Sequence, residues 1–436
     1  MILVDTALEK RKSAGNPVRV ALVGSGFSAR AVALNIITGV PGMELVAIAN
    51  RTLERARRAY REAGVDSVKS VETVAQLEQA IHSGECAITD DAMLVCQAAG
   101  IEAIIDATGQ VEFGAGVALK AFENGKHVIL MNAELDATLG PILKVYADRA
   151  GVVLTDTDGE EPGVAMNLYR LAKAMGYQPV ATGNIKGILD RYRNPDTQRE
   201  RAAQWNQSAP MITSFADGTK LSMECTIMAN ATGFRAGKRG MYGPACADVR
   251  EAATLFPTDQ LLNGGLVDYV LGAEPRTGAW VLAYTEHPVK KFYLDLFKLG
   301  SGPFYCLYTP YHLPPLQIAS SVARAVLFHD ATVAPLGAPV CDVLAAAKRD
   351  LKAGEVLDGI GGFMAYGLID NAEVLRAEGL LPVGLSEGCR LKRDLPKDAT
   401  IRYADVVMPE GRLCDKLRAE QDNYFSATVS ARMASR

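Results

Sequence analysis

The stretch VRVALVGSGFSAR, residues 18–30, decides the fold of this chain. Its apolar first half predicts a buried strand, and the apolar-periodic residues after it predict a helix. Between them, Gly24-x-Gly26-x-x-Ala29 matches the dinucleotide-binding fingerprint in its expected context. Gly24 permits the tight turn, Gly26 lets a pyrophosphate approach the backbone, and Ala29 lets helix and strand pack closely. The alternative is an ordinary glycine-rich turn, but the context favours nucleotide binding.

The end of the next predicted strand, residues 44–49, distinguishes NAD from NADP. An NAD site usually ends this strand in an acidic residue that holds the ribose 2′-OH. Here the position holds Asn50, followed by Arg51. No carboxylate there repels a 2′-phosphate, and Arg51 can bind one. We therefore expect NADP (NADPH) as the preferred cofactor and NAD as the alternative, and we assign Arg57 and Arg58 to a solvated helix face.

The composition is that of an ordinary globular protein of two or three domains, with 436 residues of which 49% are apolar and 22% charged. The net charge of −4 gives no sign of nucleic-acid binding, and no apolar run reaches membrane-span length. Residues 1–16 are polar and helix-like and lack a signal-peptide core, so we expect a cytoplasmic location. The eight cysteines are scattered without CxxC pairs, so we expect neither a zinc site nor a disulfide framework.

Predicted strands and helices alternate over residues 1–152, which favours a Rossmann-type α/β domain with a parallel sheet. Two of its strands end in Thr108-Gly109 and in Asn132, at the edge where such sheets bind ligands. We expect these residues to border the nicotinamide. The candidate cofactor-binding residues are Gly24, Ser25, Gly26, Phe27, Ser28, Ala29, Asn50, Arg51, Thr108, Gly109 and Asn132.

The rest of the chain has a different pattern. Over residues 153–335, short apolar runs alternate with Gly- and Pro-rich loops, which favours an α+β domain for substrate binding, catalysis and oligomerisation. Its last predicted helix spans residues 315–329. Residues 336–436 form a predicted third, mainly-β domain.

Lys220 is the first candidate for catalysis. Residues 217–231 predict a helix with Asp217 as its N-cap, and a lysine in the first turn opposes the helix dipole at a cost of roughly 0.3–1 kcal/mol. A locally unfavourable lysine indicates anion binding or proton transfer. Glu224, four residues on, shares its face. The alternative is a surface i,i+4 pair.

A second candidate is a predicted loop at residues 183–187, which contains Lys186 and is followed by Asp190, Arg191 and Arg193. Basic residues in such a loop can bind the anionic end of a substrate. The alternative is a solvated loop.

Four carboxylates lie within residues 156–161. They can cap the following helix, transfer a proton or contact substrate, or hold a divalent cation. These interpretations remain open, and we assign no metal ligand. His312, just before a predicted helix, either contacts substrate or is structural. The candidate catalytic residues are Lys220, Glu160, Glu161, Lys186 and His312, and the candidate substrate-binding residues are Asp190, Arg191, Arg193 and Glu224.

Six stretches of the chain carry a family resemblance, at residues 24–29, 124–128, 159–162, 217–220, 228–233 and 310–313. Together they resemble the 1-deoxy-D-xylulose 5-phosphate reductoisomerase-like (DRL) family of the homoserine dehydrogenase-like superfamily. The tail, at residues 348–357 and 381–397, looks like an SAF-type domain. The resemblance implies that Lys220 lies in the catalytic cleft and that the helix after His312 packs onto the Rossmann domain. It also implies a homodimer or homotetramer.

One departure bears on the substrate. Homoserine dehydrogenases usually carry a lysine after the strand-end asparagine, but here Ala133 follows Asn132, which argues against homoserine. We expect an NADP-dependent oxidoreductase, or a reductoisomerase, acting on a sugar, sugar acid, sugar phosphate or nucleotide-linked sugar. In it Lys220 would polarise or protonate the substrate oxygen. The alternatives are a simple alcohol/aldehyde dehydrogenase and a non-catalytic NAD(P)- or carbohydrate-binding sensor. We expect no nucleic-acid or membrane partner.

Overall fold

The chain forms two compact units in a computed structural model that describes residues 4–434 and the side chains of residues 4–426. The first unit holds Met1–Glu160, Leu313–Ala334 and Leu413–Arg436, and the second holds Glu161–His312 and Pro335–Arg412. Of the predicted N-terminal helical stretch, α1 covers Val4–Ser13, and residues 1–3 lie outside the described part. The division into three domains at residues 152 and 335 stays a prediction.

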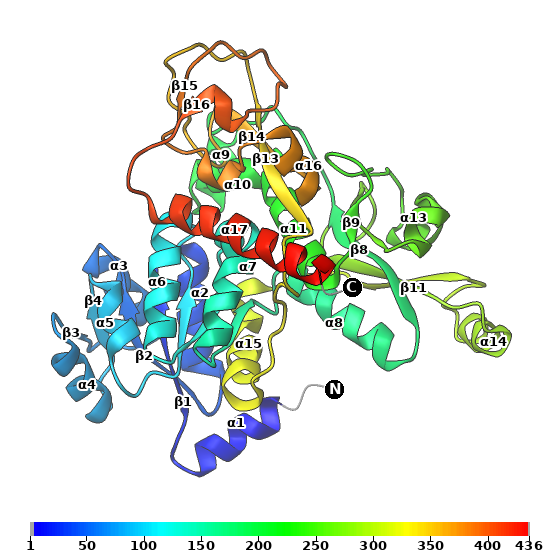
Figure 1. Ribbon diagram of the computed structural model, residues 1–436. Helices are drawn as coiled ribbons and strands as arrows, with labels where there is room; N and C mark the ends of the chain where they lie inside the picture. The colour runs from blue at the N-terminus through cyan, green and yellow to red at the C-terminus, as the bar shows by residue number, and fades with distance from the viewer. Residues whose placement is uncertain (1–3, 435–436) are drawn as a thin grey trace. The chain divides into compact units, whose positions relative to one another are not determined.

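A seven-stranded parallel sheet forms the centre of the first unit, in the order β3-β4-β2-β1-β5-β6-β7 (Figure 1). The strand order reverses between β1 and β5, which is the kind of switch point at which such sheets bind ligands. The predicted Rossmann-type α/β fold is therefore confirmed. The strands are β1 (Val18–Val23), β2 (Met43–Ala49), β3 (Lys69–Ser70), β4 (Ala87–Thr89), β5 (Ala103–Asp106), β6 (His127–Leu130) and β7 (Leu154–Asp156).

Two groups of helices pack around this sheet: α2, α3 and α15 contact one another in turn, and so do α4, α5, α6 and α7. Apolar side chains of α15, among them Ile318 and Val322, share a core with Val20 and Ile105 of the sheet. The helix after His312 thus packs onto the Rossmann sheet, as the resemblance implies. The helices are α2 (Phe27–Gly39), α3 (Leu53–Glu62), α4 (Val74–His82), α5 (Ala92–Gln97), α6 (Val111–Glu123), α7 (Ala133–Arg149) and α15 (Pro314–Phe328).

The C-terminal helix α17 (Leu413–Ala434) also packs in the first unit, against α6 and α7 (Figure 1). Gln421 Oε1 accepts the backbone N–H of Ile142 at 3.1 Å, and the Tyr146 hydroxyl donates to Glu420 at 2.8 Å. Because these partners lie far apart in the sequence, local patterns gave no sign of this packing.

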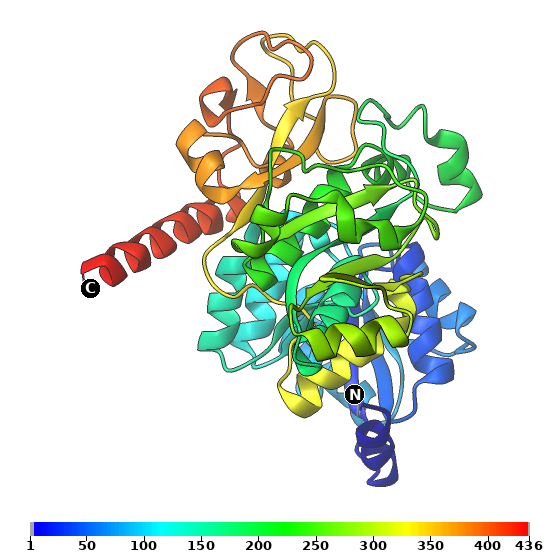
Figure 2. The ribbon, with the colours of Figure 1, turned by 90° about the vertical axis from the view of Figure 1, so that its right-hand side faces the viewer.

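A five-stranded mixed sheet, in the order β12-β11-β8-β10-β9, supports the second unit. Its strands are β8 (Gln178–Lys186), β9 (Arg235–Ala236), β10 (Leu266–Leu271), β11 (Ala279–Tyr284) and β12 (Phe304–Thr309). The main helices are α8 (Glu161–Ala174), α9 (Arg199–Gln204), α10 (Ala209–Ala216), α11 (Thr219–Thr232), α12 (Ala252–Leu255), α13 (Thr258–Leu262) and α14 (Pro288–Leu296). In Figure 2, α14 is the yellow-green helix that links β11 to β12.

The predicted loop at residues 183–187 is wrong, because β8 continues to Lys186. Its residues pair with β10 on one side and with β11 on the other. A Cβ on Gly183 would lie 1.7 Å from the carbonyl oxygen of Asp268, so only glycine fits between these strands. Tertiary pairing thus overrides the low strand propensity of Gly183 and Asn184.

The tail from residue 335 to residue 412 belongs to the second unit. It contains β13 (Cys341–Ala347), β14 (Ala365–Asn371), α16 (Ala372–Glu378), β15 (Arg390–Leu391) and β16 (Val406–Val407). β13 and β14 form an antiparallel pair that packs against α11. Lys348, just after β13, reaches the residues before α11, where its Nζ lies 2.9 Å from Asp217 Oδ2.

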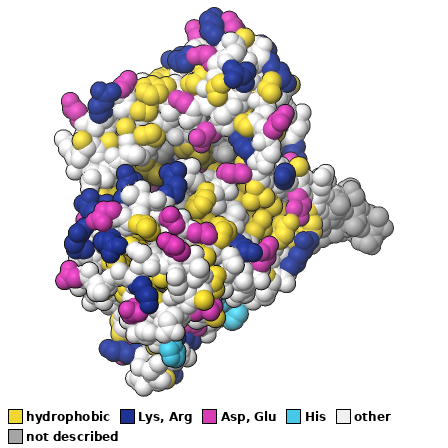
Figure 3. Space-filling model, turned by 90° about the vertical axis from the view of Figure 1, so that its left-hand side faces the viewer, with side chains coloured by type: hydrophobic (Ala, Val, Ile, Leu, Met, Phe, Trp, Pro, Cys, Tyr) yellow, Lys and Arg dark blue, Asp and Glu magenta, His cyan; other side chains and the backbone are white. Residues whose placement is uncertain are grey.

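Acidic and basic side chains stand beside one another over the face drawn in Figure 3. On that face the acidic side chains do not form a single patch. Within the described residues, no helix has both the length and the apolar character that crossing a membrane requires.

Replacing Lys348 with Met should strongly destabilise the second unit. The side chains of Lys348 and Asp217 are both buried, so the variant leaves a buried carboxylate without its cation, at a cost of about 3–5 kcal/mol. Urea unfolding measures the loss. The double variant Asp217→Asn, Lys348→Met is the control and should lose less, because it leaves no charge behind. Equal losses in both proteins would contradict the ion-pair explanation.

Candidate functional site

The turn between β1 and α2 has the backbone geometry of a phosphate site. Gly24 adopts a φ of +102°, and a Cβ there would lie 2.9 Å from the carbonyl oxygen of Ala107. Gly26 is the N-cap of α2 and makes no side-chain capping bond, and a Cβ on it would meet nothing within 4 Å. Ala29 is buried, as close packing of the helix requires. The first N–H groups of α2 therefore have room to receive a pyrophosphate.

The arginines after β2 differ in their ion pairs, as the sequence predicts. Arg57 and Arg58 form ion pairs along α3, with Glu54 and Glu62. Arg51 is exposed and makes no ion pair in the part of the chain that the structure describes. The neighbouring Asn50 does not bind the Arg51 side chain, since the Asn50 amide donates to the carbonyl oxygen of Thr52. Arg51 is thus available to a 2′-phosphate, while the preference for NADP stays a prediction.

The two strand ends expected to border the nicotinamide meet at a buried carboxylate, Asp106. The Thr108 hydroxyl donates to Asp106 Oδ1 at 2.7 Å, and the Asn132 amide donates to Oδ2 at 2.8 Å. Burial raises the pKa of Asp106. A Cβ on Gly114 would lie 2.6 Å from Asp106 Oδ2, so α6 needs a glycine there. Sequence analysis missed Asp106, although its position at the end of a predicted strand was a usable signal.

In the second unit, three charged side chains from three different elements converge. Lys186, at the end of β8, places its Nζ 3.2 Å from Glu161 Oε1 and 3.4 Å from Glu224 Oε2. Glu161 lies in the first turn of α8, and Glu224 lies on α11. Both carboxylates are buried. The expected anion-binding lysine is therefore already engaged by two carboxylates, and we call these three residues the acid–base cluster.

Polar neighbours hold the acid–base cluster in place. The Asn184 amide donates to Glu224 Oε2 at 2.6 Å. His312 Nε2 lies 3.7 Å from Glu161 Oε1, and its Nδ1 lies 3.0 Å from the Thr277 hydroxyl. Sequence analysis missed Asn184 and Thr277. Asn184 lies two residues before Lys186, and because alternate residues of a strand share one face, strand periodicity was the signal that could have found it.

The surroundings of the acid–base cluster shift the pKa values of its two carboxyl groups in opposite directions. Burial raises the pKa of Glu161, but Lys186 and His312 outweigh burial and lower it to about 2. Burial and the Glu161 carboxylate raise the pKa of Glu224. Burial opposes the charge of Lys186, yet the two carboxylates raise its pKa. Glu161 and Lys186 thus stay charged over the neutral range, and Glu224 is the carboxyl group that holds a proton more readily.

Lys220 and Glu224 do not form the surface pair that was the alternative, because both are buried. Residues 219–231 of α11 are all buried, so this helix runs through the core of the second unit. The N-cap of α11 is Gly218, with a φ of +87°, rather than the predicted Asp217. Asp217 Oδ1 still accepts the N–H of Thr219 at 2.8 Å. Lys220 lies close enough to Glu224 for its charge to offset part of the rise that burial and Glu161 cause in the pKa of Glu224.

The four-carboxylate motif is divided between the two units. Glu160 ends the first unit, where it and burial raise the pKa of Asp136 to about 7, with burial as the larger cause. Glu161 begins α8 and joins the acid–base cluster. Among the described residues, no group of three His, Cys, Asp or Glu side chains is placed to hold a metal ion.

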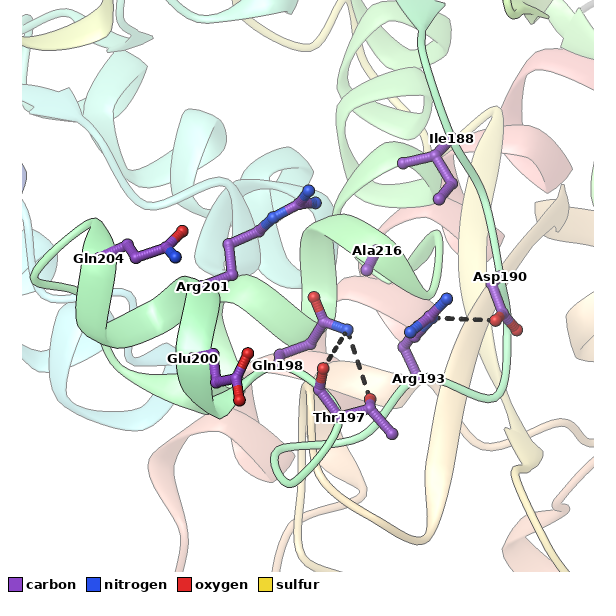
Figure 4. A pocket seen from close by; sticks show the side chains of 9 residues that line it. All are labelled: Ile188, Asp190, Arg193, Thr197, Gln198, Glu200, Arg201, Gln204 and Ala216. Atoms are coloured by element: carbon purple, nitrogen blue, oxygen red, sulfur yellow. Dashed lines mark hydrogen bonds and ion pairs between the residues drawn. The ribbon is translucent and has the colours of Figure 1, made fainter.

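The segment after β8 places its charges in two ways. Arg193 forms an ion pair with Asp190 at 3.0 Å, and both line a pocket of about 310 Å³ (Figure 4). Arg191 instead lies over the ring of Tyr366, 5.8 Å from its centroid. Substrate binding by these three residues stays a prediction.

Comparison with known proteins gives two matches to family models. Residues 18–130 match the NAD-binding Rossmann fold of an oxidoreductase family, and residues 159–318 match the catalytic domain of oxidoreductase DRL. The DRL resemblance is therefore confirmed over residues 159–318, while the homoserine dehydrogenase-like superfamily and the SAF-type tail stay predictions. A search of curated proteins finds no match.

Two of the similar solved structures are distant in sequence. Apo scyllo-inositol dehydrogenase from Lactobacillus casei is 12% identical, with a TM-score of 0.42, over 72% of this chain and 89% of that one. A 3-ketoreductase from Actinomadura kijaniata, in complex with TDP-benzene and NADP, is 15% identical, with a TM-score of 0.38, over 72% and 90%. These likenesses say nothing about the substrate here. Both family models describe oxidoreductases, and one of them describes an NAD-binding Rossmann fold. The chain is therefore an NAD(P)-dependent oxidoreductase.

Proposed function

We propose that this oxidoreductase uses NADPH to reduce a polyhydroxylated carbonyl compound: a sugar, sugar acid, sugar phosphate or nucleotide-linked sugar. The observation that carries the proposal is the acid–base cluster, in which a partly buried lysine is held between the buried carboxylates of Glu161 and Glu224. A carbonyl group that accepts a hydride develops negative charge on its oxygen. A buried cation stabilises that charge, and a neighbouring acid can neutralise it with a proton.

The first unit has the features that a dinucleotide needs, and when bound the nicotinamide supplies the hydride. The turn at Gly24 and Gly26 would hold the pyrophosphate, and Arg51 would hold the 2′-phosphate. Support comes from the positive φ of Gly24 and from the uncapped start of α2.

In the second unit, Lys186 would polarise the substrate carbonyl, and Glu224 would give its proton to the developing alkoxide. Glu161 keeps the Lys186 ammonium charged and in place, because its own pKa is lowered to about 2. Asn184 orients the Glu224 carboxyl group through the 2.6 Å hydrogen bond. Lys220 and His312 act electrostatically on the acid–base cluster and remain candidates for substrate contact.

We further propose that hydride transfer is coupled to rearrangement of the carbon skeleton, as in a reductoisomerase. The resemblance of the sequence to the reductoisomerase-like (DRL) family supports rearrangement, and the alternative is a simple alcohol/aldehyde dehydrogenase, which the match to an oxidoreductase catalytic domain fits equally. A non-catalytic sensor finds no support, because both matching models describe oxidoreductases. A homodimer or homotetramer and an SAF-type tail remain part of the proposal.

Titration with NADPH and NADH should show tighter binding of NADPH, followed by the fluorescence of the reduced nicotinamide. Arg51→Ala should weaken NADPH binding about tenfold, by loss of a charge-assisted bond, and leave NADH binding unchanged. Arg57→Ala is the matched control, since that arginine pairs with Glu54 and should not affect either affinity. Tighter binding of NADH would overturn the choice of cofactor.

The two reaction directions should depend oppositely on pH. Reduction needs protonated Glu224, so its rate falls as pH rises through the raised pKa of this group, while oxidation needs the carboxylate and its rate rises. Glu224→Gln should remove both dependences and lower kcat by roughly 100- to 10,000-fold. Unchanged NADPH affinity and unfolding temperature would show that the fold is intact. Persistence of the pH dependence in the variant would exclude Glu224 as the proton donor.

Turnover of an isotope-labelled hydroxyketone sugar phosphate with NADPH should give a product whose carbon connectivity differs from that of the substrate. Rearrangement needs proton movement at two neighbouring oxygens, for which the site offers Glu224, whose pKa is raised, and His312, whose Nε2 lies 3.7 Å from Glu161 Oε1. Carbon NMR of the product measures the connectivity. An unchanged skeleton would leave the oxidoreductase in place and remove the rearrangement.

A further inference from the structure

A pocket of about 310 Å³ in the second unit is lined by the segment that follows β8 and by α9. Its first lining residue, Ile188, lies two residues after Lys186, so their Cα atoms are at most about 7.6 Å apart. Figure 4 shows the side chains of α9 on one side and Ile188, Asp190 and Arg193 on the other. Its volume is at the lower end of small-molecule sites, which run from roughly 300 to 1,000 Å³.

The charges that line this pocket are balanced. The lining includes Asp190 and Glu200 together with Arg193 and Arg201, which gives two negative and two positive side chains. Arg193 already pairs with Asp190. The two carboxylates would repel an anion through their charge, and the ion pair with Asp190 already neutralises one of the two arginines.

The uncharged lining residues supply both donors and acceptors. Gln198 and Gln204 present amide groups, whereas the Thr197 hydroxyl is already engaged, because it donates to the carbonyl oxygen of Asn194 and accepts the Asn194 N–H. The Gln198 amide donates to the carbonyl oxygen and to the hydroxyl of Thr197, at 3.0 and 3.3 Å, which holds it in place. Together with the carboxylates and guanidinium groups, these side chains match a ligand whose groups each donate and accept. Hydroxyl groups have that property.

We infer that this pocket is a subsite for an uncharged, polyhydroxylated part of the substrate. The inference rests on the proposed function and narrows it: neutral sugars, or the neutral end of a larger sugar derivative, fit better than a phosphate or carboxylate end. It also revises the expectation from sequence that the segment after β8 binds an anionic group. Arg193 and Arg201 donate to ligand oxygens, and Asp190 and Glu200 accept from ligand hydroxyls.

Tryptophan fluorescence can test this inference without cofactor or turnover. The chain has two tryptophans, and Trp205, which follows α9 directly, is half exposed and carries the Arg201 guanidinium 5.3 Å from its ring centroid. Glucose, ribose and myo-inositol are the neutral probes, and gluconate and inorganic phosphate are the anionic ones. We expect a saturable change in emission with at least one neutral probe, at lower concentration than with either anion. Trp205→Phe should abolish the change, because Trp280 is buried elsewhere in the core.

Two variants of α9 locate the ligand, with affinity measured by calorimetry. Arg201→Ala should weaken binding of the neutral probe about tenfold, the effect of losing a hydrogen bond from a charged donor. Arg199→Ala is the matched control: it is an exposed arginine of the same helix that pairs with Asp196 and does not line the pocket. Affinity in this variant should stay unchanged.

Tighter binding of phosphate or gluconate would make the pocket an anion site and overturn the inference. No saturable response to any neutral probe, or equal loss in both arginine variants, would also overturn it. Failure of the proposed function looks different. A protein that oxidises no NADPH with any carbonyl compound can still bind the neutral probes, and that result would leave a sugar-binding pocket without the proposed chemistry.

Discussion

The pairing of buried charges is the constraint on which the second unit depends. Its central helix α11 is buried along nearly its whole length, yet it carries Lys220 and Glu224. Ionised groups can stay in such a core only where opposite charges and hydrogen bonds offset the loss of hydration. Lys186 and Asn184 offset the lost hydration of the Glu224 carboxylate. Lys348 offsets that of Asp217, just before the helix.

The pairing of buried charges also gives the two carboxyl groups of the acid–base cluster different pKa values. Lys186 and His312 lower the pKa of Glu161 against the effect of burial, whereas burial and the Glu161 carboxylate raise the pKa of Glu224. A split of this kind assigns one group to hold charge and the other to move a proton. The proposed phosphate site of the first unit differs, because it would consist of backbone N–H groups at the start of α2, which glycines leave accessible to a ligand. In the proposed function, backbone groups of the first unit would bind the cofactor and side chains of the second unit would transfer the proton.

Much of the first unit could be predicted from local pattern. The strand, the glycine turn and the helix at residues 18–39 follow from neighbouring residues alone, and so do the polar ends of β5 and β6. β3, β4 and α5 are short and escaped prediction. The network at Asp106 escaped as well, because it joins residues from three segments and needs the absence of a side chain at Gly114.

In the second unit, the sequence by itself determined which chemical groups were available: Glu161, Lys186, Glu224 and His312 are unusual enough in their local settings to be named as candidates. Only the tertiary structure decided that Glu161 and Glu224 meet at Lys186, and that Asn184 holds Glu224. The same holds for the strand through Gly183, the balanced pocket after β8 and the return of α17 to the first unit. The physical reason is range: propensity, capping and periodicity act between near neighbours, whereas burial and charge pairing join residues far apart in the chain.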